Sequence, residues 1–130
     1  MRLLIDTQVF IWLINADERI GSKTYELLND STNVVNLSYF SLFEMKIKAT
    51  IGKLTYDDSV VDDLPKMGIE LLMPTTEALT KYSIPNDANK DPFDNILIAT
   101  ARSEKCIFVT SDPKILGLSV KDLRLQEAQK

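Results

Sequence analysis

The hydrophobic and polar positions of the chain fall into blocks that alternate between two patterns. Short, continuous apolar runs predict strands buried on both faces, and longer blocks with apolar residues three or four positions apart predict helices. The predicted strands are residues 2–5, 34–37, 69–73 and 106–110, with a weaker one near 118–120. The predicted helices are residues 9–14, 23–28, 39–51, 59–66 and 92–104, with two shorter ones from 75 or 76 to 82 and after Pro113. Strands that alternate with helices indicate an α/β fold with a mainly parallel sheet.

Local signals mark the ends of several of these elements. Ser38 is placed to cap the helix that follows it, and Gly52 is placed to end that helix. Gly68 separates a helix from a strand, and residues 84–90, which include proline, asparagine and aspartate, predict a loop. Because the chain has no repeat, low-complexity stretch or linker, we expect one domain over residues 1–130.

The composition narrows the possible chemistry. The chain has no histidine, which excludes histidine-based acid–base catalysis, Ser-His-Asp hydrolysis and most zinc sites. Its net charge of −4 argues against a broad basic surface for nucleic acid, but a bound cation can reverse the sign of an acidic pocket. No apolar run is long enough to span a membrane, and Asp6 interrupts the N-terminal run too early for a signal peptide. The single cysteine, Cys106, opens an apolar run and is expected in the core, so these features together predict a cytoplasmic protein.

Two acids follow predicted strands. Asp6 comes directly after the first strand, and Asp112 comes shortly after the strongest one. The carboxyl ends of parallel strands form the edge at which such folds bind ligands. Taken singly, both acids are more simply explained as helix caps, since Asp6 precedes Thr7 and Asp112 precedes Pro113.

Glu44 lies within the apolar stripe of its predicted helix. Phe40, Ile47 and Ile51 project on the same side of the helix as Glu44, which places this carboxylate toward the core. A carboxylate on a buried face needs a cation, a hydrogen-bond donor or a proton. The simplest partner is Lys48, one turn later, in an i,i+4 ion pair.

Asp94 has a similar position on the predicted helix 92–104. It projects beside Leu97, Ile98 and Ala101, which are apolar. Its simplest explanation is a capping-box-like role, with Asp91 as the N-cap and Asp94 at the third helical position.

Four carboxylates at strand ends and on buried helix faces need positive charge nearby to offset the cost of burying them. Mg²⁺ and Mn²⁺ prefer carboxylate and water oxygens, so a divalent cation resolves the difficulty. The candidate metal-binding and catalytic residues are therefore Asp6, Glu44, Asp94 and Asp112. A site of this kind typically activates a water for in-line attack on a phosphodiester, which requires no histidine.

Four blocks of the sequence resemble those of the PIN-domain nucleases, and within them the VapC-like toxins of prokaryotic toxin–antitoxin pairs. The blocks occur in order over nearly the whole chain, and each contains one of the four acids: LLIDTQVFIW (3–12), SLFEMKIKATIGKL (41–54), DPFDNILIATA (91–101) and IFVTSDP (107–113). The resemblance implies a three-layer α/β/α sandwich around a mainly parallel sheet of four to five strands. It also implies an Mg²⁺- or Mn²⁺-dependent endoribonuclease that leaves a 5′-phosphate. The implied partners are RNA, a second copy in a homodimer, and a cognate antitoxin whose C-terminal segment covers or enters the site.

The chain departs from this pattern at three positions. Gln8 and Asn89 stand where related chains often carry histidine, and Asn95 stands where an arginine commonly follows the third acid. Because none of these changes removes an acid, we expect metal binding to be retained, whereas an RNA preference or an antitoxin pairing is not carried over.

Other residues near the acids have two interpretations each. Asp112 binds the cation directly or through water. Thr7 and Ser111 either orient the carboxylates or cap helices, and Asp91 is more simply a helix cap than a metal ligand. Three lysines near Glu44 either steer RNA phosphates or lie on a solvated helix face: Lys46, Lys48 and Lys53. The solvated face is the simpler explanation for Lys46 and Lys53. The aromatic residues either stack on bases or, by default, pack in the core: Phe10, Trp12 and Phe43.

Two other classes of function stay open. A haloacid-dehalogenase-like phosphatase needs a second acid where Gln8 stands, and a receiver-type phosphoacceptor needs an acidic pair near the first strand, where only Asp6 lies. A PIN-like domain that serves as a catalytically silent binding or scaffold module would tolerate the replacement of Asp6 and Asp94 by asparagine.

Overall fold

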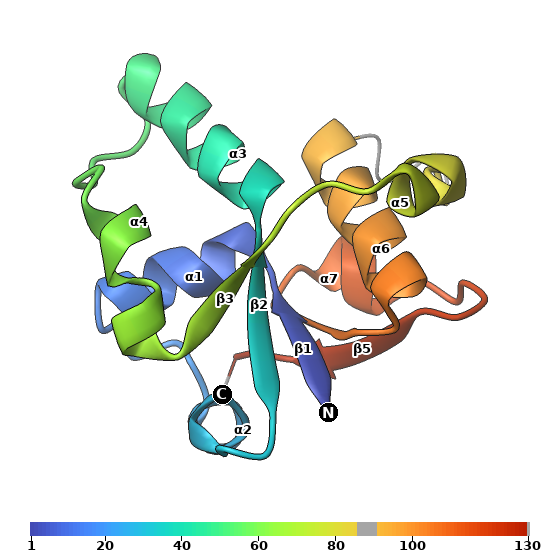
Figure 1. The fold of residues 1–130 in the computed structure, drawn as a ribbon, viewed down its shortest axis with the longest axis horizontal. Helices are drawn as coiled ribbons and strands as arrows, with labels where there is room; N and C mark the ends of the chain where they lie inside the picture. The colour runs from blue at the N-terminus through green and yellow to red at the C-terminus, as the bar shows by residue number, and fades with distance from the viewer. Residues whose placement is uncertain (86–90, 130) are drawn as a thin grey trace.

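The structure, a computed structural model, describes residues 1–85 and 91–129. Within these residues a five-stranded sheet forms the centre, with strand order β3-β2-β1-β4-β5 and parallel pairing throughout (Figure 1). The strands are β1 (Arg2–Ile5), β2 (Val34–Ser38), β3 (Ile69–Leu72), β4 (Ile107–Thr110) and β5 (Arg124–Glu127). The helices are α1 (Thr7–Ile14), α2 (Ser22–Asn29), α3 (Tyr39–Thr50), α4 (Val60–Asp63), α5 (Thr76–Lys81), α6 (Pro92–Glu104) and α7 (Pro113–Leu116), with a 3₁₀ turn η1 (Pro65–Met67). The predicted α/β fold with a mainly parallel sheet is confirmed.

Helices cover both faces of the sheet, which gives three layers. Successive side chains of a strand point to opposite faces, so Leu3 and Ile5 enter one core cluster and Leu4 enters the other. The first cluster packs the sheet against α1, α3 and α4, and the second packs it against α6 and α7. The α/β/α sandwich expected from the resemblance is therefore present. Within the described chain, no helix is both long enough and apolar enough to cross a membrane.

The strand order reverses beside β1. The chain runs from β1 to β2 and β3 on one side and then returns to place β4 on the other side of β1. The backbone N–H of Asp6 donates to the carbonyl of Val109 at 2.9 Å, so the carboxyl ends of β1 and β4 lie side by side. In open α/β sheets, the crevice at such a reversal is where ligands bind.

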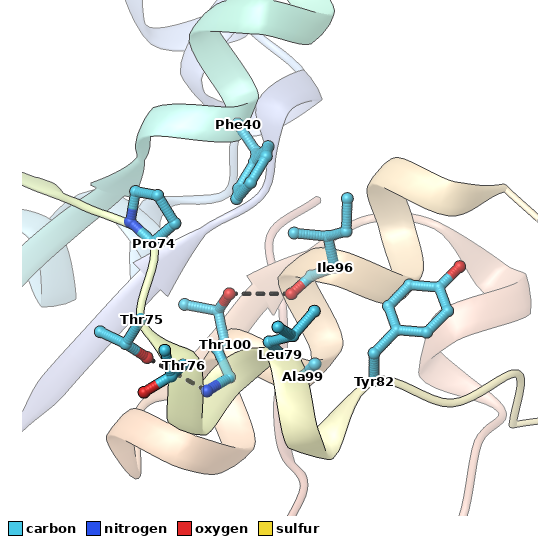
Figure 2. A pocket seen from close by; sticks show the side chains of 10 residues that line it. Phe40, Pro74, Thr75, Thr76, Leu79, Tyr82, Ile96, Ala99 and Thr100 are labelled. Carbon is cyan, nitrogen blue, oxygen red and sulfur yellow. Dashed lines mark hydrogen bonds between the residues drawn. The ribbon is translucent and has the colours of Figure 1, made fainter.

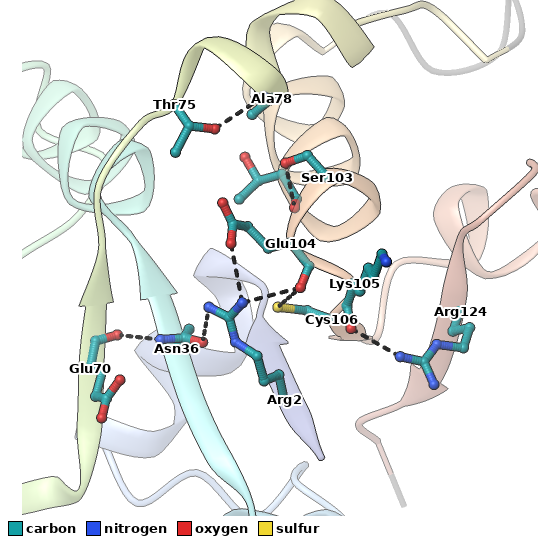
Figure 3. Close-up of polar contacts among 11 residues, drawn as sticks. Arg2, Asn36, Glu70, Thr75, Ala78, Ser103, Glu104, Lys105, Cys106 and Arg124 are labelled. Atoms are coloured by element: carbon teal, nitrogen blue, oxygen red, sulfur yellow. Dashed lines mark hydrogen bonds and ion pairs between the residues drawn. The ribbon is translucent and has the colours of Figure 1, made fainter.

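At the opposite, amino end of the sheet, Arg2 ties four elements together (Figure 3). Its guanidinium donates to the Glu104 carboxylate of α6 at 3.1 Å and to the Asn36 side chain of β2 at 3.3 Å. The Asn36 amide in turn donates to the carbonyl of Glu70 in β3 at 3.3 Å. This network fixes the strands against α6 at the amino end and leaves the carboxyl edge for ligands.

Several predicted ends agree with the structure. The Ser38 hydroxyl accepts the N–H of Phe40 at 3.1 Å and so caps α3. Gly52 follows α3 with φ of 77°, in the left-handed region that glycine adopts without strain. Gly68, with φ of 72°, separates η1 from β3.

Two predicted elements are wrong. The single helix expected at 59–66 is divided into α4 and η1, because Pro65 lacks a backbone N–H and starts a new turn. The last strand is Arg124–Glu127 rather than 118–120, since residues 121–122 form a turn in which Asp122 has φ of 64°. Of the loop predicted at 84–90, residues 86–90 lie outside the described residues.

Candidate active site

Asp6 lies at the carboxyl end of β1 and is only 6% exposed. One carboxylate oxygen, Oδ1, accepts the backbone N–H of Thr7 at 2.7 Å, so Asp6 does cap α1. The other oxygen, Oδ2, accepts the hydroxyl of Thr110 at 2.7 Å. Burial raises the pKa of Asp6 to about 6, although both hydrogen bonds lower it. A capping role and a buried, perturbed carboxylate therefore occur in the same residue.

Thr110 is a residue that the sequence analysis missed. It ends β4, is completely buried, and accepts the backbone N–H of Asp112 at 3.1 Å while it donates to Asp6. The hydroxyl of Thr7, by contrast, donates to Ser41 of α3 at 2.9 Å. Thr7 thus orients Asp6 through its backbone, and Thr110 orients it through its side chain.

Glu44, on α3, is buried at 8% exposure, and its two oxygens differ. Oε2 forms the predicted i,i+4 ion pair with Lys48, with Nζ at 2.9 Å. Oε1 is buried and has no hydrogen-bond partner among residues 1–85 and 91–129. An unpaired carboxylate oxygen in this position is costly unless a ligand completes it.

The surroundings of Glu44 differ from the prediction. Ile47 and Ile51 are exposed, whereas Met45 is buried. In Figure 1, α3 extends beyond the carboxyl end of β2, away from the sheet, so most of its predicted apolar stripe has no core to face. Glu44 lies in the middle of α3, a helix that contacts α1 and α6, and its side chain is buried although Ile47 and Ile51 are not.

Asp94 lies in the first turn of α6, above the buried residues Leu97, Ile98 and Ala101, as predicted. Asp91 is the N-cap, and its Oδ1 accepts the backbone N–H of Phe93 at 2.9 Å and that of Asp94 at 3.3 Å. Burial raises the pKa of Asp94 to about 7. Neighbouring negative charges also contribute to this raised pKa, in decreasing order those of Asp91, Asp6, Asp112 and Glu44.

Asp112 is half-buried and caps α7. Its Oδ1 accepts the backbone N–H of Lys114 at 2.9 Å. The negative charge of Asp112 contributes to the raised pKa of Asp6 and to that of Asp94. Asp112 therefore acts as a cap and also belongs to the same electrostatic environment as the other acids.

The fold thus brings the four predicted acids to one edge of the sheet, from β1, α3, α6 and the β4–α7 connection. Within residues 1–85 and 91–129, no three histidine, cysteine, aspartate or glutamate side chains stand close enough together to hold a metal ion as they are. The negative charges of neighbouring acids raise the pKa values of Asp6 and Asp94, in addition to burial.

The donor set fits a hard divalent cation. All four acids supply carboxylate oxygens, which Mg²⁺ and Mn²⁺ prefer. The buried Oε1 of Glu44, which has no hydrogen-bond partner among the described residues, is an oxygen that such a cation would bind. The residues that would hold the ion are Asp6, Glu44 and Asp94, with Asp112 directly or through water.

The other predicted participants are divided between the core and the surface. Phe10 and Trp12 are buried core residues, as expected by default, whereas Phe43 is exposed and packs edge-to-face on Tyr39. Lys46 forms an exposed ion pair with Asp58.

The positions where the chain departs from the family pattern differ in burial. Gln8 is exposed and Asn95 is buried, while Asn89 lies outside the described residues.

Comparison with known proteins agrees with this fold. The sequence model of the PIN domain matches residues 3–120, so the chain belongs to the PIN domain family. No curated protein matches the chain significantly in sequence.

Two solved structures are similar to the chain over nearly its whole length. One is VapBC2 from Rickettsia felis bound to a DNA fragment from its promoter, with a TM-score of 0.71 and 17% identity over 99% of this chain and 100% of that one. The other is VapBC-1 from nontypeable Haemophilus influenzae, with a TM-score of 0.65 and 20% identity over 98% of both chains. At these identities, the similarity shows a shared fold.

Proposed function

We propose that the chain is an Mg²⁺- or Mn²⁺-dependent endoribonuclease and the toxin of a VapC-like toxin–antitoxin pair that acts in the cytoplasm. The observation that carries the proposal is the meeting of four acids at the strand-order reversal. There burial raises the pKa of Asp6 to about 6 and that of Asp94 to about 7. Perturbed carboxylates in such a crevice are typical of catalytic sites. Membership of the PIN domain family supports nuclease chemistry for the site.

Each acid has a defined part in the proposed reaction. Asp6, Glu44 and Asp94 hold the cation, and Asp112 contributes directly or through an intervening water. Thr110 and the Thr7 backbone hold the Asp6 carboxylate in one orientation. The cation, when bound, supplies Lewis-acid activation of the attacking water and of the phosphodiester. The 5′-phosphate product follows if the 3′-oxygen of the preceding nucleotide is the leaving group.

We also propose that the protein forms a homodimer through a groove between α3, α5 and α6. The groove has a volume of about 370 Å³ and an apolar lining to which Phe40, Leu79, Tyr82 and Ile96 contribute. Figure 2 shows Phe40 of α3 across from Ile96 of α6, with Leu79 on α5 and Tyr82 at its end. Leu79 is 73% exposed. A second copy is the occupant we propose, because the same apolar groove on each copy of an acidic chain provides a surface that the other can cover.

An antitoxin is the second proposed protein partner. Both similar solved structures are described as VapBC assemblies, which supports a partner of the VapB type for this chain.

The test of the nuclease proposal is cleavage of a mixed RNA pool by the purified protein in Mn²⁺, in Mg²⁺ and in excess EDTA. Asp6→Asn and Asp94→Asn are assayed in parallel, with Asp62→Asn, an exposed acid on α4, as the matched control. We expect metal-dependent cleavage by the wild type and the control and none by the two site variants. Metal binding with intact RNA under every condition would favour a silent scaffold, and cleavage that survives both site substitutions would contradict the assigned site.

A further inference from the structure

Lys48 lies between the buried Glu44 carboxylate and solvent. Its Nζ is 2.9 Å from Oε2 of Glu44, and the Lys48 side chain is 43% exposed whereas that of Glu44 is 11% exposed. A lysine ammonium has three N–H donors, and one contact with Oε2 leaves donor capacity on the solvent side. The ammonium is therefore held at the acid cluster and remains accessible to a second anion.

The charge of the chain makes a basic group beside the acids useful for binding RNA. With a net charge of −4, the protein as a whole repels RNA, and a positive charge at the acid cluster reduces this repulsion locally. In the described part of the chain, the other ion-paired basic residues have partners outside the cluster: Arg2 with Glu104, Arg19 with Asp17, Lys46 with Asp58 and Lys66 with Asp63. Among the ion pairs of these residues, the one between Lys48 and Glu44 is the pair that includes a cluster acid.

We propose that Lys48 is a substrate-binding residue that contacts a backbone phosphate of the RNA strand beside Glu44. The inference rests on the proposed nuclease function and adds a phosphate-binding group to it. Glu44 fixes the ammonium at the mouth of the site through Oε2, and the remaining N–H donors bind the phosphate. Because this residue both neutralises Glu44 and attracts the substrate, an acidic chain can bind a polyanion beside its acid cluster.

The experiment measures RNA binding without turnover. The probe is a fluorescein-labelled, mixed-sequence single-stranded RNA of about 20 nucleotides in Ca²⁺, a cation that also binds carboxylates. Affinity is measured at salt concentrations from about 50 to 300 mM, where each phosphate contact contributes about −0.7 to the slope of log K against log salt for single strands. In Lys48→Met we expect affinity to fall about tenfold at low salt and the slope to become shallower by about 0.7. Lys48→Arg should retain most of the slope.

The matched control is Lys46→Met, which removes the same charge two residues away on α3, where Lys46 pairs with exposed Asp58. It should leave the slope unchanged. Mn²⁺ affinity, followed by electron paramagnetic resonance in the absence of RNA, should not fall in Lys48→Met, because the variant removes a positive charge from beside Glu44 and removes no metal ligand. If Lys48→Met does not fold, Glu44→Gln is compared with Glu44→Gln/Lys48→Met, in which no carboxylate needs a partner.

The outcomes separate the two proposals. An unchanged slope in Lys48→Met, with wild-type RNA binding intact, shows that Lys48 serves only as the counter-ion of Glu44 and overturns the inference alone. A wild type that neither binds nor cleaves any RNA overturns the nuclease proposal and the inference with it. A shallower slope in Lys48→Met and in Lys46→Met alike would show a diffuse charge effect and would also overturn the specific contact.

Discussion

The hydroxyl of Thr110 donates a hydrogen bond of 2.7 Å to Oδ2 of Asp6, joining two residues that are 104 positions apart in the sequence. Both residues are almost fully buried, at the carboxyl ends of the adjacent strands β1 and β4. The same hydroxyl accepts the backbone N–H of Asp112, so one side chain connects two acids of the site. The geometry of the site thus depends on a neutral residue at its centre.

We expect Thr110→Val to lower cleavage activity by about 10–100-fold, the usual effect of losing a group that orients a metal ligand. The isosteric change removes the hydrogen bond and leaves the buried Asp6 oxygen unpaired, which should also cost about 1–3 kcal/mol of unfolding free energy. Since the Thr110 hydrogen bond lowers the pKa of Asp6, the variant should need a higher pH for half-maximal metal binding. Thr110→Ser keeps the hydroxyl and should restore both activity and the pH midpoint. A loss in Thr110→Ser as large as that in Thr110→Val would contradict the role of the hydrogen bond, because serine retains the donating hydroxyl.

The metal-free protein should lose stability as the pH rises toward neutral. Burial and neighbouring acids raise the pKa of Asp94 from 3.8 to about 7 in the folded state. A raised carboxyl pKa means that the folded state holds a proton that the unfolded state has released, so this contribution to stability is complete below pH 4 and is lost as the pH passes through about 7. Thermal unfolding in EDTA at pH 5, 6, 7 and 8 should therefore show a Tm that falls with pH.

Asp94→Asn should weaken this dependence and leave the smaller part that comes from the raised pKa of Asp6, whereas Asp62→Asn on the exposed face of α4 should not change it. Added Mn²⁺ should restore the Tm of the wild type at pH 8, because a cation stabilises the ionised form of the site. A Tm that rises steadily from pH 5 to pH 8 in EDTA would contradict the raised pKa of Asp94.

Glu44→Gln should separate stability from metal binding. The amide retains the size of the side chain but removes a buried charge whose Oε1 is unpaired, and it leaves Lys48 free to reach solvent. We therefore expect a higher Tm than wild type in EDTA and an Mn²⁺ affinity that is lower by at least about tenfold. Glu77→Gln, an exposed acid on α5, should change neither quantity. A lower Tm together with unchanged Mn²⁺ affinity would place Glu44 outside the metal site.

The elements that the sequence predicted well are those whose signals are local. Helix α6 has both ends as predicted because Asp91 caps it, Pro92 occupies its first turn, and its apolar spacing is long and regular. The four acids were found for a similar reason, since Asp6 and Asp112 follow strands and Asp94 lies on a face that is buried in the structure. Parallel pairing then brings strand ends together without further information.

The features that the sequence did not predict depend on distant neighbours. Threonine is common in strands, so Thr110 does not stand out in the sequence. Its hydroxyl meets a carboxylate because β4 pairs with β1. A helical projection places Ile47 beside Glu44, but it does not show that α3 extends beyond the sheet and leaves Ile47 47% exposed. The strand β5 is mostly polar and lies at the sheet edge, so no hydrophobic run marks it in the sequence. It is defined by its pairing with β4 and by the packing of the partly buried Leu125 against the second core cluster.

Leu79→Glu should convert the proposed homodimer to a monomer. Leu79 lines the groove between α3, α5 and α6 and is 73% exposed in the single chain, so a charge there costs little in the monomer. In a dimer the same carboxylate would be desolvated without a partner, which should raise the dissociation constant by at least about 100-fold.

Met67→Glu, on η1 at the other end of the molecule from α5, provides the matched control and should leave the dimer intact (Figure 1). Analytical ultracentrifugation across protein concentrations, with circular dichroism to check folding, measures the effect. A wild type that is monomeric at every concentration would exclude the dimer. A dimer that persists in Leu79→Glu would place the interface on another surface, such as the exposed Phe43 and Ile47 side of α3.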